Sequence, residues 1–153
     1  MYHSACAAGH KALWHSEWGG LPDAETLTKL DPYLALVRER YGNAPQPAVV
    51  KAGTLTPEWA DKLGLSTDVC ISGCTFDAHA GAIGAGIKEK TMICTIGTSA
   101  ADMIVTKPNY PQGKNMRAYG GQAENSILPG YVGLETGQAA FGDIFAWFKK
   151  VLM

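Results

Sequence analysis

Between residues 69 and 86 the sequence changes character, and this stretch limits the possible folds more than any other. Residues 69–72, VCIS, are an apolar run that predicts a short buried strand, which Gly73 closes. Asp77 then precedes a run of mostly small residues at 78–86, which favours a short helix beginning at Asp77. The glycines of this run stand in the reverse order of the dinucleotide-binding fingerprint, so we interpret them as close-packing positions rather than a cofactor loop.

Before this stretch the sequence predicts helices. Residues 23–41 carry leucine and valine at helical intervals, but Pro32 interrupts the period. We therefore expect two short helices or one kinked helix, ending before Gly42. Thr56 followed by proline and glutamate is a typical helix start, and that helix should end near Gly64.

After it the sequence predicts strands and a final helix. Residues 91–96 and 101–106 indicate a hairpin around the polar tip at 97–99. Further expectations are a loop over 107–118, a strand over 131–134 and a helix from residue 137 onward. Grouped strands with interspersed helices favour a layered α/β or α+β fold.

Composition excludes several functional classes. The chain has 153 residues, 46% of them hydrophobic, and a formal net charge of −1. Without a basic block, the sequence predicts no binding to nucleic acid or to a membrane surface. It contains no apolar run of membrane-spanning length and no signal-peptide pattern at its start, so we expect a soluble, cytoplasmic protein.

The four cysteines are too few for a disulfide scaffold of this length. Three of them lie in apolar, strand-like surroundings, where a free cysteine is expected to be a small core residue. A zinc site is the alternative near the start of the chain, but the spacing there matches no standard ligand pattern. We therefore expect packed or solvated side chains and no metal site, the residues concerned being His3, Cys6, His10 and His15.

Three local patterns could carry chemistry, and each has a purely structural alternative. Asp77 could cap a helix or accept a proton, since a helix N-terminus attracts negative charge. The turn Gly97, Thr98 and Ser99 could be only a turn, or its amides and hydroxyls could bind phosphate. The segment 135–138 could cap the final helix or bind a ligand. The physics of the single sequence leaves these alternatives open.

Taken together, five motifs resemble the FGGY carbohydrate kinase family. The resemblance covers nearly the whole chain, and residues 14–22, WHSEWGGLP, point to the ribulose-phosphorylating branch. The motifs are, in order, GHKALWH at 9–15, AGTLTPEW at 52–59, FDAHAGA at 76–82, IGTS at 96–99 and GLETGQ at 133–138.

The resemblance implies a fold, a reaction and roles for particular residues. The fold would be part of the actin/hexokinase/RNase-H-like fold of a two-domain sugar kinase, with residues 1–68 ending the first, sugar-binding domain and 69–153 beginning the second, ATP-binding domain. The reaction would be ATP-dependent phosphorylation of L-ribulose or a related ketopentose at O5, with Mg²⁺, in arabinose breakdown. The implied site consists of Asp77 as catalytic base, Lys11 and Glu135 as sugar-binding residues, and Gly97, Thr98 and Ser99 as the turn that binds the ATP phosphates.

The sequence also departs from the family. The N-terminal phosphate loop and the later Gly-rich adenine-binding region are absent, so we expect a segment that is inactive alone. Trp14 and Trp18 could line the sugar pocket, but packing is the commoner role of large aromatics at a domain edge. The first alternative is a non-catalytic nucleotide-binding or interaction module of the same superfamily. A zinc-binding domain ranks third, well below both. Homo-oligomerisation stays open.

Overall fold

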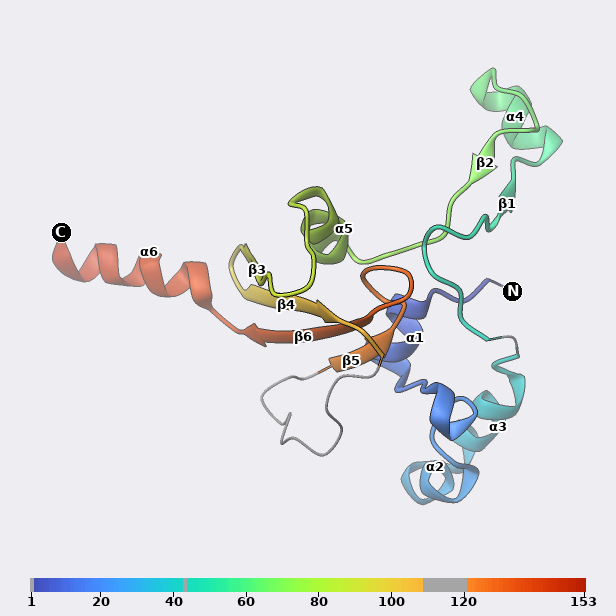
Figure 1. Cartoon of the computed structure of the whole chain (residues 1–153), viewed down its shortest axis with the longest axis horizontal. Helices are drawn as coiled ribbons and strands as arrows, with labels where there is room; N and C mark the ends of the chain where they lie inside the picture. Colours follow the sequence, from blue (N-terminus) through green and yellow to red (C-terminus); the bar gives the residue numbers. More distant parts are fainter. Residues whose placement is uncertain (1, 43, 109–120) are drawn as a thin grey trace. The chain divides into compact units, whose positions relative to one another are not determined.

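The structure is a computed structural model that describes residues 2–42, 44–108 and 121–153. The chain divides into two compact units, Met1–Thr75 and Phe76–Met153, and Figure 1 labels the helices and strands of both. The division follows Thr75, somewhat later than the boundary expected before residue 69. The assignment of the two units to the first and second domains of a kinase stays a prediction.

The first unit consists mainly of short helices. The helices after residue 20 follow local sequence signals, whereas residues 1–20 show no clear helical period. The elements are α1 (Ala5–Ala12), a 3₁₀ helix (Ser16–Trp18), α2 (Ala24–Leu30), α3 (Pro32–Arg40), β1 (Gly53–Thr54), α4 (Pro57–Leu63) and β2 (Cys70–Ile71).

The predicted helix break at Pro32 is confirmed. Asp31 has an extended backbone, as expected for a residue before proline, and this conformation separates α2 from α3. Its carboxylate accepts the Tyr33 amide N–H at 2.8 Å and so caps α3. Helix α4 is also confirmed, because Thr56 caps its start and Gly64 ends it with a φ of +65°.

Two expectations about buried residues are wrong. Strand β2 pairs with β1 over only two residues, and Ile71 is 40% exposed, so the VCIS run does not form a buried strand. A two-stranded ribbon of this length has no layer packed over it that could bury its side chains. Of the four cysteines Cys6 alone is buried, whereas Cys70, Cys74 and Cys94 are exposed and do not pack as core residues.

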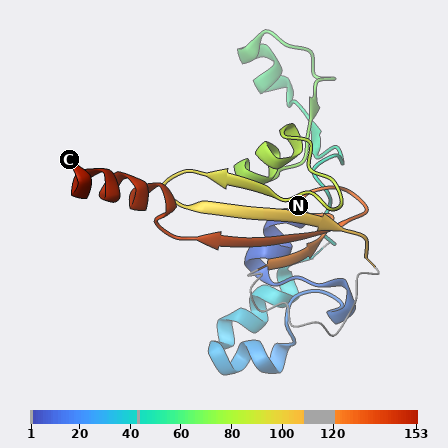
Figure 2. The ribbon, with the colours of Figure 1, turned by 60° about the vertical axis from the view of Figure 1, so that its left-hand side comes forward.

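The second unit is a four-stranded antiparallel sheet with helices (Figure 2). Its strands follow the order β3-β4-β6-β5, so β4 and β6 are the central pair. The hairpin predicted around residues 97–99 is confirmed as β3 and β4, whereas the sequence had not indicated β5. The elements are α5 (Asp77–Gly84), β3 (Ile93–Ile96), β4 (Ala100–Thr106), β5 (Gly121–Glu124), β6 (Val132–Gln138) and α6 (Phe141–Leu152). The loop expected over 107–118 lies largely outside the described residues.

The core of the second unit lies where α5 packs against the sheet. Met103 on β4 is fully buried, and Ala82 on α5 is buried against the same cluster. Ala82 packs against the strands, but the expectation that the glycines of this run are close-packing positions is wrong, because a Cβ at Gly81, Gly84 or Gly86 would meet nothing within 4 Å. Ile87, Val105 and Ile127 complete the buried cluster.

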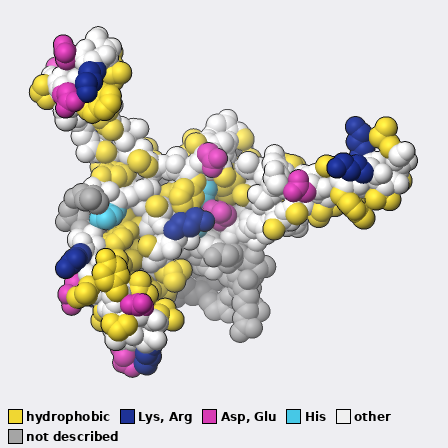
Figure 3. Space-filling model, turned by 180° about the vertical axis from the view of Figure 1, so that it is seen from behind, with side chains coloured by type: hydrophobic (Ala, Val, Ile, Leu, Met, Phe, Trp, Pro, Cys, Tyr) yellow, Lys and Arg dark blue, Asp and Glu magenta, His cyan; other side chains and the backbone are white. Residues whose placement is uncertain are grey.

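Helix α6 follows β6 and exposes its apolar side chains (Figure 3). Phe145 and Trp147 are each 62% exposed. The expectation of a helix at the end of the chain is confirmed, with a start at Phe141 rather than at residue 137. Within the described part of the chain, no helix combines the length and the apolar character needed to cross a bilayer.

The pairing of β3 with β4 places Cys94 opposite Asp102. The hydrogen bond between the thiol and the carboxylate raises the pKa of Cys94, and desolvation and the negative charge of Asp102 act in the same direction. A higher pKa leaves less thiolate, which is the reactive form, near pH 8. We therefore expect the pairing with Asp102 to slow the alkylation of Cys94.

We expect Asp102→Asn to accelerate alkylation of Cys94 at pH 8, because the substitution removes the negative charge and lowers the pKa of the thiol. Peptide mapping after timed treatment with iodoacetamide measures the rate at each cysteine. The difference should shrink as the pH rises further, because a growing share of the thiol is then ionised in both proteins. Labelling of exposed Cys70 in the other unit serves as the internal control. An equal rate at Cys94 in both proteins would contradict the prediction.

Candidate active site

Asp77 is the first residue of α5 and is exposed. Its Oδ1 accepts a hydrogen bond from the Ala78 amide at 2.8 Å. The capping position itself belongs to Phe76, whose backbone is extended and whose side chain offers no hydrogen bond. Asp77 is therefore not the N-cap that the structural alternative required, and it presents a carboxylate to solvent at the positive end of the helix.

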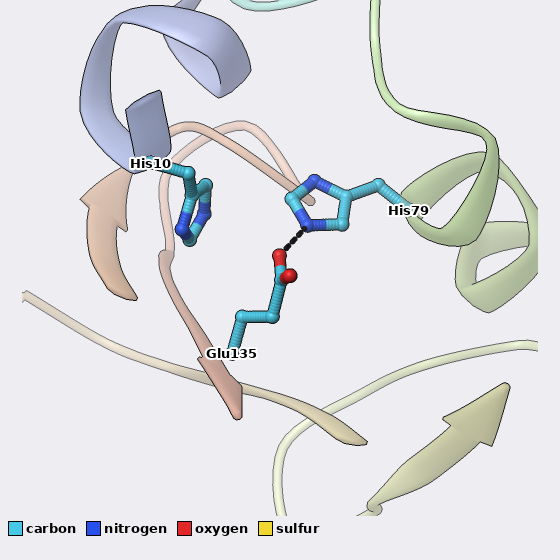
Figure 4. Close-up of side chains that lie close together, drawn as sticks. All are labelled: His10, His79 and Glu135. Carbon is cyan, nitrogen blue, oxygen red and sulfur yellow. Dashed lines mark hydrogen bonds and ion pairs between the residues drawn. The ribbon is translucent and has the colours of Figure 1, made fainter. Parts of the chain in front are cut away.

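Glu135 lies on β6 and is joined to α5 by a hydrogen bond. Its Oε2 is 2.7 Å from Nε2 of His79 (Figure 4). The His79 side chain is fully buried, and the Glu135 side chain is 26% exposed. Opposite Glu135 in the register stands Met103, which belongs to the core beneath α5. Glu135 consequently occupies the helix-covered face of the sheet.

The position of Glu135 excludes one alternative for its segment. Residues 135–138 belong to strand β6, and α6 begins later, at Phe141. Ala140 holds the capping position with a φ of +58° and makes no side-chain cap. The interpretation of this segment as a helix cap is therefore wrong, and the segment supplies a strand side chain instead.

The turn of Gly97, Thr98 and Ser99 connects β3 to β4 and is exposed. The Gly97 amide donates to the Ser99 carbonyl at 2.7 Å, which closes the turn. The Gly142 amide donates to the carbonyls of Gly97 and Thr98, at 3.1 and 3.0 Å. The start of α6 therefore binds two backbone carbonyls of the 97–99 segment, while the side chains of Thr98 and Ser99 lie at the surface.

Gly142 permits this contact because it has no side chain. A Cβ atom at this position would overlap the carbonyl oxygen of Gly97 and lie 3.1 Å from its carbonyl carbon. Since the overlapping atoms are backbone atoms, rotation of a side chain cannot relieve the clash. Gly142 fixes the distance between α6 and the turn.

Lys11 lies in the first unit, in the last turn of α1, and is exposed. The structure thus brings Asp77, Glu135 and the 97–99 turn into one folded unit and places Lys11 in the other. The roles of all six residues in binding or catalysis stay predictions.

A pocket of about 400 Å³ lies beside α1 and α2 in the first unit, lined by Leu13, Trp18, Pro22 and Asp23. Trp18 is 58% exposed and forms part of this wall, so it does not pack into a core as expected. Backbone and side-chain hydrogen bonds from Thr26 lower the pKa of Asp23, because they stabilise its ionised carboxylate. Asp23 is thereby committed to capping α2.

Two residues of the zinc alternative, His3 and His15, have individual contacts in the first unit. The ring of His3 stacks on Tyr41, with centroids 4.3 Å apart. Nδ1 of His15 accepts the Glu17 amide N–H at 3.2 Å and caps the 3₁₀ helix. These contacts are those of packed and capping side chains.

Two residues of the site were not singled out from the sequence. His79 stands two positions after Asp77. A histidine within a run of small residues could have indicated a buried ring, because small neighbours leave room for it. Gly142 carries no sequence signal, since a glycine in the first turn of a helix has many explanations. Its role depends on the 97–99 turn, which is distant in sequence.

The comparison with solved structures defines the class of fold. No protein-family model matches the chain. The crystal structure of a xylulose kinase from Rhodospirillum rubrum is similar with a TM-score of 0.63 and 22% identity, covering 78% of this chain and 24% of that protein. The chain therefore has part of the fold of that kinase, and the expected actin/hexokinase-like fold class is confirmed.

Sequence similarity is more specific. The chain is 42% identical to a ribulokinase of Vibrio parahaemolyticus over 148 residues and 37% identical to one of Geobacillus thermodenitrificans over 153 residues. These matches cover 97% and 98% of this chain and 26% of each relative. The resemblance to the FGGY carbohydrate kinases, and among them to ribulokinases, is confirmed. The chain spans about a quarter of the length of these relatives.

Proposed function

We propose that the full-length protein containing this chain is a carbohydrate kinase that phosphorylates L-ribulose at O5, using ATP with Mg²⁺, in arabinose breakdown in the cytoplasm. Similarity to ribulokinases over nearly the entire chain supports this function. The structural observation that carries the proposal is Asp77, an exposed carboxylate at the first residue of α5, directly after the division between the two units.

The reaction requires little covalent chemistry from the protein. The sugar O5 attacks the γ-phosphorus, the bond from this phosphorus to the β–γ bridging oxygen breaks, and ADP leaves. Because the transition state of phosphoryl transfer is loose, positioning and neutralisation of charge dominate catalysis. Asp77 orients the O5 hydroxyl and accepts its proton late in the step.

The other residues position the two substrates. We propose that the Lys11 ammonium donates hydrogen bonds to sugar hydroxyls and that the Glu135 carboxylate accepts them. Gly97, Thr98 and Ser99 contact the phosphates of ATP through the exposed turn, where hydroxyls and backbone amides are suitable donors. Mg²⁺ enters with ATP as part of the substrate.

The function is tested by measuring ADP formation by the full-length protein with a panel of ketopentoses, glycerol and xylulose. We expect L-ribulose to give the highest kcat/KM, and ¹³C NMR of the product to place the phosphate on C5. The 153-residue chain assayed alone should give no turnover above the buffer rate, because it spans only about a quarter of the relatives. Equal activity without any sugar, or phosphorylation at another carbon, would contradict the proposal.

A further inference from the structure

We infer that His79 is a positioning residue that holds the Glu135 carboxylate in place for sugar binding. The inference rests on the proposed function, because it gives Glu135 its sugar-binding role. The family resemblance gave no role to His79. His79 itself is fully buried and acts through Glu135.

The hydrogen bond between the two side chains defines which atoms take part. An ionised carboxylate can only accept, so the hydrogen of the 2.7 Å contact belongs to Nε2 of His79. The ring thus donates from Nε2 to one oxygen of Glu135. A carboxylate has roughly four acceptor positions, and this bond occupies one of them.

The surroundings of His79 make its ring a rigid donor. The ring is fully buried and lies 5.3 Å from the ring of Phe76, measured between centroids. A histidine has two side-chain torsions, and close packing of the ring fixes both. Glutamate has three torsions and is partly exposed here, so its bond to the fixed ring restricts the rotamers that the side chain adopts. The hydrogen bond selects one orientation before the sugar arrives, which lowers the entropy lost on binding.

Helix α5 connects this pair to the proposed catalytic base. Asp77 and His79 are two residues apart, which places them on roughly opposite sides of the helix. Asp77 is accordingly exposed, whereas His79 is buried and reaches β6 (Figure 4). A single helix therefore fixes both the base and the sugar-binding carboxylate, and a change at His79 should disturb Glu135 while Asp77 keeps its place.

The alternative is that His79 is only a satisfied core residue. Both roles predict some loss of stability on substitution, but only the positioning role predicts a selective effect on sugar binding. Two amide substitutions separate them. The Gln amide nitrogen can reach the position of Nε2, whereas the shorter Asn amide reaches only the region of Nδ1.

The test compares His79→Gln with His79→Asn in the full-length protein. We expect His79→Asn to raise the KM for L-ribulose about tenfold or more, because small displacements of a positioning group are costly. Both kcat and the KM for ATP should stay within about threefold of the parent. His79→Gln should restore the KM for L-ribulose to within about threefold of the parent, since it keeps the donor. Equal effects of the two variants on both substrates would overturn the inference.

A measurement on the unsubstituted protein covers the case in which neither variant folds. A ¹H–¹⁵N correlation spectrum of the histidine side chains should show His79 protonated at Nε2, with a shift on saturation by L-ribulose. A His79 signal that does not respond to the sugar would refute the positioning role. The outcomes also separate the two proposals. An unsubstituted protein without ribulose-dependent ADP formation refutes the function, whereas normal turnover with a parental KM in His79→Asn refutes only the role of His79.

Discussion

Asp77→Asn in the full-length protein should lower ribulose-dependent turnover by about 10²-fold or more, because removing a general base normally has an effect of this size. The asparagine amide cannot accept the O5 proton. Its carbonyl oxygen can still accept the Ala78 amide N–H, so α5 should keep its first turn. Steady-state ADP formation at saturating ATP and ribulose measures the change.

Asp61→Asn is the matched control for this substitution. Asp61 is an exposed acid on a helix of the first unit, and it has no proposed role at the site. Its turnover should stay within about twofold of the parent, since surface substitutions change little. Thermal unfolding of both variants checks that the fold is intact. A loss of only a few-fold in Asp77→Asn would exclude Asp77 as the base.

Gly142→Ala should impair ATP binding without affecting the sugar. The new methyl group would overlap the backbone carbonyl of Gly97, so either α6 or the 97–99 turn must move. Overpacking of this kind costs about 1–3 kcal/mol of stability. We expect the KM for ATP to rise about tenfold and the KM for L-ribulose to stay within about threefold, because misplaced positioning groups weaken binding selectively.

Gly81→Ala supplies the control for the glycine substitution. A Cβ at Gly81 would meet nothing within 4 Å, and the residue lies inside α5. Alanine should stabilise this helix by up to about 1 kcal/mol and leave both KM values unchanged. If Gly142→Ala lowers the unfolding temperature but leaves the KM for ATP unchanged, the turn does not contact the nucleotide. If neither quantity changes, the close approach of α6 does not hold the turn.

Local signals in the sequence predicted much of the helical structure. Proline at position 32 divided the helical segment, and the threonine and proline at 56 and 57 marked the start of α4. These features act through neighbouring backbone atoms, so they are readable without the fold. The two-residue ribbon of β1 and β2 shows the limit, because the apolar composition of residues 69–72 does not determine whether another layer covers them.

The candidate site was likewise predicted only in part from the sequence. Asp77 and the 97–99 turn were recognisable from motifs of adjacent residues. Glu135 was also selected, but its place on strand β6 depends on pairing with β4. The contacts of His79 and Gly142 could not be predicted from the sequence. His79 is 56 positions from Glu135, and Gly142 is distant from Gly97 along the chain.

The sequence alone determined where most helices begin and end, the hairpin of β3 and β4 and the resemblance to sugar kinases, because these depend on neighbouring residues or on motifs in order. The tertiary structure alone decided which side chains are buried and which distant groups meet. His79 donates to Glu135 only because α5 packs against the sheet, and Gly142 contacts Gly97 only because α6 returns to the turn. Burial and long-range contact are properties of how elements pack, and no short segment of sequence encodes them.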